Sequence, residues 1–265
     1  MLERDDPRVE CDPDIQILMG DAALAGPARA LGPYRLAGDM LLFEMPGVAR
    51  YRCEAGERIT VEPAAGATQS AIAGYLIATA LPALLWMRGD IVLHMAAAVL
   101  PGMSGAIAFG GATGSGKSSI LDRLVGAGAR AVADDTICVR FDSESPIVSG
   151  LPGGYFLADG DDARIFRTVP SGQHASSMRL AGVVMLGPRK ATGPAEFNAL
   201  TGASAFEALL AGRHRQRVPI LLGKDKALLP MLARLSRDLP IHGWDRVEGQ
   251  PEVDPEELAR LLRGA

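Results

Sequence analysis

The stretch GATGSGKSSI at 111–120 constrains this chain more than any other part of its sequence. The apolar run AIAFG precedes it and the amphipathic run SSILDRLV completes it, which predicts a strand, a tight loop and a helix in that order. The loop fits the pattern G-x-x-x-x-G-K-[ST], with Gly111, Gly116, Lys117 and Ser118 at the defining positions. The pattern therefore predicts a loop that wraps its backbone around phosphate groups.

Each part of this loop has a physical role in binding phosphate. Glycines let successive backbone N–H groups point inward, and the helix N-terminus adds the positive end of its dipole. Lys117 is expected to reach the β- and γ-phosphates, and the Ser118 hydroxyl to bind Mg²⁺. The other predicted nucleotide-binding positions are Ala112, Thr113, Gly114, Ser115 and Ser119. We expect ATP and Mg²⁺ as ligands; the alternative is a glycine-rich turn that binds nothing.

Two adjacent carboxylates follow the loop. The sequence VADD places Asp134 and Asp135 at the end of a predicted strand, seventeen residues after Lys117. We expect this strand to lie beside the strand of the loop, so that one aspartate faces the γ-phosphate and the other the metal. An aspartate there can accept the proton of an incoming hydroxyl. The alternative is that the pair only ends the strand and caps a turn.

Composition excludes several classes of protein. A net charge of −4 gives no electrostatic reason to expect nucleic acid as a partner. Cys11, Cys53 and Cys138 are too far apart in sequence to suggest a zinc site or a disulfide framework, which fits a reducing cytoplasm. The acidic N-terminus is unlike a signal peptide. The apolar segment 70–87 approaches the length of a membrane span, but a buried core helix has the same pattern, and we expect the latter and no membrane association.

The order of predicted elements gives an α/β chain with two parts. Strands dominate up to Gly66, so residues 1–66 are expected to form a small β-rich module and 67–265 the larger domain. Within the larger domain we expect a helix at 68–88, a hairpin that leads into the loop, a strand at 129–141, an irregular excursion over 143–166, a buried strand at 179–187, and helices at 203–217, 225–237 and 254–263.

From LHMAAAVL through the glycine loop to VADD, the chain resembles the HPr kinase/phosphorylase superfamily. His94, Gly111, Gly116, Lys117, Ser118, Asp134 and Asp135 fall on its motif positions. The resemblance implies a P-loop kinase core of the HPr kinase C-terminal, PEP carboxykinase-like type. It implies catalytic roles for His94, Lys117 and Asp134, with His94 near the phosphates and Asp134 as general base. It also implies that Ser118 and Asp135 hold the metal. Without the resemblance, a lone histidine at an apolar strand is more often a core residue.

The chain also departs from that family. A glutamate that assists the metal in HPr kinases has no equivalent here; Asp159, Asp161 or Asp162 could replace it, or could form a solvated acidic loop. The N-terminal third is too short for the usual regulatory domain, so neither HPr as substrate nor the reverse phosphorylase reaction is expected.

The motifs GVARY at 47–51, WMRGD at 86–90 and GLPGG at 150–154 resemble shorter HPr-kinase-like proteins. Some of these proteins phosphorylate the C-terminal serine of a lasso-peptide precursor. The resemblance thus implies a peptide or protein acceptor with a serine hydroxyl, and the family's oligomers make a homo-oligomer an open expectation. An ATP-dependent switch and a small-molecule hydroxyl kinase remain alternatives.

One further cluster has two interpretations. Arg213, His214, Arg215 and Arg217 are predicted to lie within two helical turns. Such a cluster could clamp a phosphate or an acidic peptide, but an exposed helix face is the favoured interpretation. His174 and His242 lack metal-ligand spacing and are assigned no role.

Overall fold

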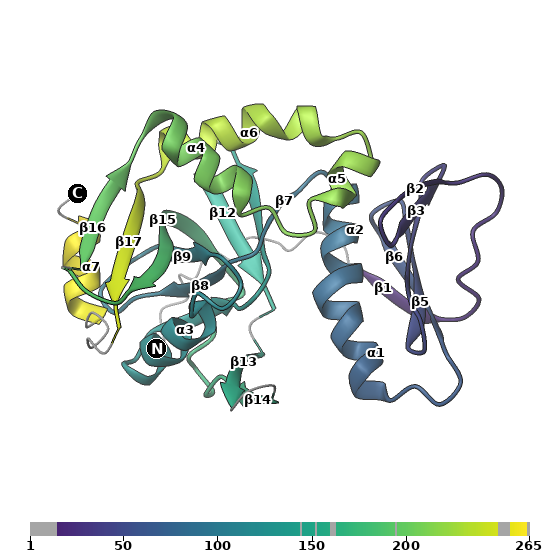
Figure 1. The fold of residues 1–265 in the computed structure, drawn as a ribbon, viewed down its shortest axis with the longest axis horizontal. Coiled ribbons are helices and arrows are strands. Elements are labelled where there is room, and N and C mark those ends of the chain that lie inside the picture. Colours follow the sequence, from purple (N-terminus) through teal and green to yellow (C-terminus); the bar gives the residue numbers. More distant parts are fainter. Residues whose placement is uncertain are drawn as a thin grey trace, which may run out of the picture. The chain divides into compact units, whose positions relative to one another are not determined.

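A computed structural model describes residues 15–143, 145–151, 153–159, 163–193, 195–248 and 255–263 (Figure 1). The chain divides into two compact units, Met1–Arg88 and Gly89–Ala265. Cys11, Asp161 and Asp162 lie outside the described residues, and for Asp159 the backbone alone is described. The two units are described separately.

The first unit is a six-stranded sheet with a helical segment packed on it. The strands run in the order β1-β6-β5-β4-β3-β2, and all pairs are antiparallel except β1 with β6. Alternation in the sequence explains the two faces, because every second residue of β5 is buried. The strands are β1 Gln16–Met19, β2 Arg29–Leu31, β3 Tyr34–Ala37, β4 Met40–Met45, β5 Ala49–Glu54 and β6 Arg58–Pro63.

The helical segment of this unit comprises α1 (Gln69–Tyr75), the π-helical turn η1 (Leu76–Ala80) and α2 (Leu81–Arg88). Thr68 begins it, because its hydroxyl accepts from the N–H of Ala71 at 3.2 Å. Contacts with β5 and β6 hold it on the sheet. Since the helix packs on this sheet, the boundary between the units follows Arg88, not Gly66 as the sequence predicted.

The same segment, Gln69–Arg88, is the one helix among the described residues that is long and apolar enough to cross a membrane. Its mean hydropathy is 1.6 over the relevant window, of which 33% is buried. The buried side chains include Leu84 and Trp86, and the hydroxyl of Tyr51 on the sheet donates to the carbonyl of Ile72. A core helix passes the same length and composition test, and these contacts are those of a helix packed on a sheet.

The second unit carries the glycine loop. Its strands are β7 Ile91–Leu93, β8 Ala96–Val99, β9 Ala106–Gly111, β10 Arg130–Ala133, β11 Ile137–Asp142, β12 Ser145–Gly150, β13 Gly154–Asp159, β14 Ala163–Thr168, β15 Ser177–Lys190, β16 Glu196–Leu200 and β17 Ile241–Val247. Its helices are α3 Lys117–Gly126, α4 Gly202–Ala211, α5 Arg217–Leu221, α6 Asp225–Asp238 and α7 Pro255–Arg263.

Most of these strands join one mixed sheet, so the α/β class is confirmed. Among the described residues its order is β10-β8-β9-β15-β12-β11-β7, with β17 also pairing with β15 and β16 pairing with β17. The predicted hairpin is present as β8 and β9. The expected position of the strand that leads to Asp134 was wrong. Because β8 pairs with β9, β10 lies one strand away from the loop's strand and not beside it. Two successive antiparallel pairings still leave β10 parallel to β9, so both strands end at the same edge.

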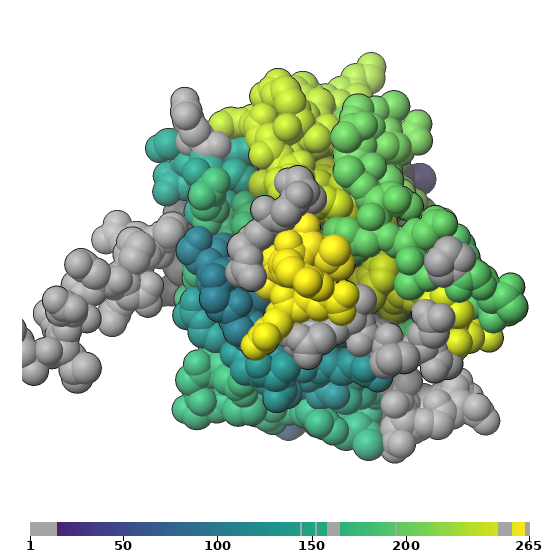
Figure 2. Space-filling view, turned by 90° about the vertical axis from the view of Figure 1, so that its left-hand side faces the viewer, coloured from purple at the N-terminus to yellow at the C-terminus, as the bar shows by residue number. Residues whose placement is uncertain are grey.

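Helices cover both faces of this sheet. α3 and α7 lie on one face, in a core that joins Leu121, Leu124, Leu258 and Leu262 to Phe109 of β9. Figure 2 views the left-hand side of Figure 1 and shows α7, in yellow, at the surface. Figure 1 shows α4 and α6 on the side of the sheet opposite to α3. The loop between β9 and α3 is therefore anchored at both ends by buried apolar residues.

Two predicted segments differ from the structure. The irregular excursion over 143–166 contains β12 and the hairpin β13–β14 instead, because its glycines sit where strands pack closely: a Cβ on Gly154 would lie 2.5 Å from the carbonyl oxygen of Arg167. The helix expected over 203–217 ends at Ala211. There the backbone turns and pairs with β7. The N–H of His94 donates to the carbonyl of Gly212 at 2.8 Å, and the N–H of His214 donates to the carbonyl of Val92 at 2.9 Å.

Candidate functional site

The glycine loop, defined here as Gly111–Ser118, has the backbone shape that its sequence predicts. Gly111, Gly114 and Gly116 have φ of +141°, +80° and +89°, values that favour glycine. Gly111 also needs its lack of a side chain, because a Cβ would lie 2.7 Å from the carbonyl oxygen of Leu186. Gly116 is the N-cap of α3 and provides no side-chain cap, so the first-turn N–H groups of α3 face the loop without a capping group.

Lys117 lies inside the loop and closes it. Its side-chain amine donates to the carbonyl oxygens of Gly111 at 3.0 Å and Ala112 at 3.1 Å, and the residue is buried. Burial lowers the pKa of this amine, against the opposing effect of Asp135 and Asp134. The loop also encloses the Ser115 hydroxyl, which is buried and has no hydrogen-bond partner among the described residues. A buried cation and an unsatisfied hydroxyl suit an anion with several oxygens, as ATP would provide.

Asp134 contacts the loop directly. The Ser118 hydroxyl lies 3.0 and 2.9 Å from its two carboxylate oxygens. Burial raises the pKa of Asp134, and the hydrogen bond from Ser118 partly opposes the shift. The sequence paired Ser118 with Asp135 as metal residues, whereas the structure brings Ser118 together with Asp134. A hydroxyl beside a carboxylate is the donor set that holds Mg²⁺ in phosphate loops.

Asp135 has different partners from Asp134. It lies in a turn between β10 and β11, with φ of +64° and a hydrogen bond from the N–H of Thr136 to the carbonyl of Asp134 at 2.7 Å. His94 Nδ1 lies 2.9 Å from the carbonyl oxygen of Asp135 and 3.4 Å from its carboxylate. The two aspartates thus contact different side chains, Ser118 and His94, and a turn rather than strand pleating separates them. His94, predicted to lie near the phosphates, is next to Asp135.

His214 joins this group from the end of α4. Its Nδ1 lies 2.8 Å from the Thr136 hydroxyl, and its ring centroid is 5.0 Å from that of His94. Burial lowers the pKa of His94 and lowers that of His214 to about 4. His214 is therefore not on an exposed helix face, the interpretation that the sequence favoured for 213–217. Its burial follows from the pairing of its backbone with β7.

Arg246 is a residue of this region that sequence reasoning missed. It lies in β17 and is 4% exposed. Its guanidinium donates to the carbonyl oxygens of Ser115 and of Gly187, the latter at 3.2 Å. Its Nη1 lies 3.3 Å from the position that a Cβ on Gly116 would occupy. The available signal was the two-residue period of the strand IHGWDRV, which puts Arg246 on the same face as Trp244.

The remaining predicted positions lie on the outer side of the loop. Ala112, Thr113, Gly114 and Ser119 are exposed, as expected for residues that contribute mainly backbone groups. The proposed replacements for the family's glutamate, Asp159, Asp161 and Asp162, fall where side chains are not described, so that prediction is not tested.

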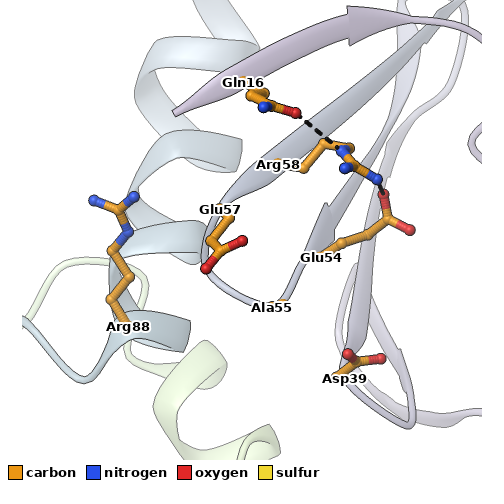
Figure 3. A pocket seen from close by; sticks show the side chains of 7 residues that line it. All are labelled: Gln16, Asp39, Glu54, Ala55, Glu57, Arg58 and Arg88. Carbon is orange, nitrogen blue, oxygen red and sulfur yellow. Dashed lines mark hydrogen bonds and ion pairs between the residues drawn. The ribbon is translucent and has the colours of Figure 1, made fainter. Parts of the chain in front are cut away.

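A separate hollow of about 400 Å³ lies in the first unit (Figure 3). Its lining is polar and charged: Gln16, Asp39, Glu54, Ala55, Glu57, Arg58 and Arg88. Arg58 donates to Gln16 at 3.4 Å and lies 3.9 Å from Glu54, which Figure 3 shows as dashed lines. Arg88 donates to the carbonyl of Gly56. These contacts tie the ends of sheet and helix together and give the hollow a structural role.

The strand, the glycine loop, the helix and the paired aspartates thus meet at one edge of a mixed sheet. No family model matches the chain, and no curated protein matches it. Among solved structures, the Hpr(Ser) kinase/phosphatase from Coxiella burnetii is similar over 65% of this chain and 88% of that one, at 14% sequence identity and a TM-score of 0.38.

Proposed function

We propose that this chain is an ATP- and Mg²⁺-dependent kinase that phosphorylates a serine hydroxyl of a peptide or protein. The observation that carries the proposal is the contact of Ser118 with Asp134 at the mouth of a glycine loop that encloses Lys117. Bound Mg-ATP would supply a γ-phosphoryl group and the charge that activates it. A C-terminal serine of a lasso-peptide precursor is the acceptor that the family resemblance suggests.

The contacts favour a division of roles different from the one that the sequence predicted. Asp134 and Ser118 lie within 3.0 Å of each other, so both can reach one Mg²⁺ ion, and we assign both to the metal. Asp135 is more exposed, with 47% of its side chain accessible, and we assign it to the acceptor hydroxyl as proton acceptor. His94 positions Asp135 through the contact with its carbonyl.

Lys117 and Arg246 provide the positive charge of the site. The amine of Lys117 now donates to two loop carbonyls. Rotation of its side chain would let it donate to phosphate oxygens instead. Arg246 fixes the loop from the opposite strand through Ser115. Because phosphoryl transfer depends mainly on positioning and charge neutralisation, two cations around one loop suit that reaction.

The experiment is intact-mass spectrometry of a panel of acceptors after incubation with Mg-ATP. The panel contains serine-ended peptides, the same peptides ending in alanine, and HPr. We expect a gain of one phosphate on a serine-ended peptide, absent from its alanine counterpart. Asp135→Asn should abolish transfer while ATP binding persists, whereas Lys117→Ala should weaken ATP binding itself.

The outcomes separate this proposal from its rivals. Steady release of free phosphate with no modified acceptor would indicate an ATPase switch. Phosphorylated small hydroxyl compounds, with peptides untouched, would indicate a small-molecule kinase. Full transfer by Asp135→Asn together with loss in Asp134→Asn would restore Asp134 as the base.

A further inference from the structure

The fold gathers two histidines and one carboxylate from three distant segments. His94 follows β7, Asp135 lies in the turn after β10, and His214 follows α4. One ligand atom from each lies within 4.8 Å of the other two. We refer to these three residues as the His–Asp cluster. The backbone hydrogen bonds between 92–94 and 212–214 fix the two histidines relative to each other.

The hydrogen bonds around the cluster orient both rings. His94 Nδ1 lies 2.9 Å from the backbone carbonyl of Asp135, which can only accept, so Nδ1 carries the proton and Nε2 carries the lone pair. His214 Nδ1 lies 2.8 Å from the Thr136 hydroxyl. Metal-binding histidines almost always use one ring nitrogen for the metal and give the other to a carbonyl, carboxylate or other polar group. Both rings have such a polar partner at Nδ1, a backbone carbonyl for His94 and a hydroxyl for His214.

The donor set selects a class of ion. Two imidazoles and one carboxylate suit Zn²⁺, Mn²⁺, Fe²⁺ or Co²⁺, whereas Mg²⁺ and Ca²⁺ prefer oxygen ligands alone. A tetrahedral ion with bonds of about 2.1 Å spaces its ligands about 3.4 Å apart, so the three atoms need to close by at most roughly 1.4 Å. Side-chain rotation can supply such a movement.

The surroundings leave room for a further ligand. His214 is buried, but the side chains of His94 and Asp135 are 26% and 47% accessible to solvent. An ion held by three protein ligands in such a place keeps a position for water or for a substrate oxygen. The ordinary alternative is a pair of packed histidines, whose rings are tilted by 41°.

We propose that the His–Asp cluster binds one divalent transition-metal ion, Zn²⁺ or a similar ion, separate from the Mg²⁺ assigned to Ser118 and Asp134. The proposal goes beyond the kinase function and does not depend on it, since it needs neither nucleotide nor acceptor. If both hold, the ion lies on the acceptor side of Asp135.

The test uses Co²⁺ as a spectroscopic probe on the full chain, stripped with a chelator and without nucleotide. We expect one equivalent of Co²⁺ to produce visible absorption bands, which Zn²⁺ then displaces. His94→Gln and His214→Gln should each weaken Co²⁺ binding at least tenfold. His174→Gln, a histidine outside the cluster, and Ser118→Ala, at the Mg²⁺ position, should retain it. Circular dichroism checks that each variant is folded.

A second measurement needs no variant. Histidine modification by diethyl pyrocarbonate, mapped by mass spectrometry, should show that Zn²⁺ protects His94 and His214 but leaves His174 unchanged. Absence of Co²⁺ bands and of Zn²⁺ protection would overturn the proposal, as would binding that survives both cluster variants. Phosphoryl transfer plays no part in either readout, so a failed metal site and a failed kinase assignment are distinguishable.

Discussion

Alanine at Gly111 should destabilise the second unit far more than alanine at Gly114. At Gly111 the φ of +141° is nearly exclusive to glycine and should cost an alanine about 1 to 3 kcal/mol. A Cβ there would also lie 2.7 Å from the carbonyl of Leu186, whose strand pairs with β9 at this residue. Displacing packed backbone should add about 1 to 3 kcal/mol, for a total of roughly 2 to 6 kcal/mol.

Gly114 provides the matched control in the same loop. Its φ is +80°, but a Cβ there would meet nothing within 4 Å. Gly114→Ala should therefore cost about 1 to 2 kcal/mol, through backbone strain alone. The expected difference between the variants, about 2 kcal/mol or more, is due to the contact with β15.

Urea unfolding followed by tryptophan fluorescence measures both effects. The chain has two tryptophans, Trp86 in the first unit and Trp244 in the second, so a Trp86→Phe background makes fluorescence report the second unit. With a slope of about 2 kcal/mol per M urea, the two midpoints should differ by about 1 M. Equal midpoints, or a loss below about 1 kcal/mol for Gly111→Ala, would refute the packing of this loop against β15.

Three further perturbations test other parts of the structure. Burial raises the pKa of Asp134, so its ionised form costs stability at pH 7, and Asp134→Asn should increase the free energy of unfolding there. Urea titrations should show this gain shrinking as the pH falls through the raised pKa, because the wild-type carboxyl then becomes neutral. His242 is buried against Phe197, its Nδ1 has no hydrogen-bond partner among the described residues, and burial lowers its pKa. His242→Phe should therefore raise the free energy of unfolding by about 1 kcal/mol. It should also remove the loss of stability that protonation of this histidine causes below about pH 6.5. Arg140→Ala leaves the buried carboxylate of Asp90 without its two hydrogen bonds from Arg140, and it should lower the free energy of unfolding by about 2 to 3 kcal/mol. Thermal melting measures this loss. An unchanged melting temperature would exclude a stabilising role for the pair.

The local elements around the glycine loop could be predicted from the sequence, because each has its own signal. The apolar run before Gly111, the glycine spacing and the amphipathic run after Lys117 predict β9, the loop and α3, and all three are present. The hairpin with β8 and the long buried strand β15 are confirmed for the same reason. Periodicity and turn residues are local properties, and they act within a few residues.

Contacts between distant segments could not be predicted in this way. The position of β10 depends on which strand pairs with β8, a choice made by the whole sheet. His214 was placed on a helix because its sequence continues the helical pattern, but pairing of the backbone with β7 ends α4 at Ala211. Arg246 had no motif, since its role arises where β17 approaches the loop. Tertiary pairing overrides local propensity at each of these places.

The side chain of Lys117 has a consequence for ligand affinity. Its ammonium group lies within the loop and donates to the carbonyls of Gly111 and Ala112. If the proposed ATP binds here, its phosphate competes with these two carbonyls for the same cation. Phosphate binding would then exchange one set of partners of Lys117 for another. Its affinity should be weaker than the number of contacts in the complex suggests.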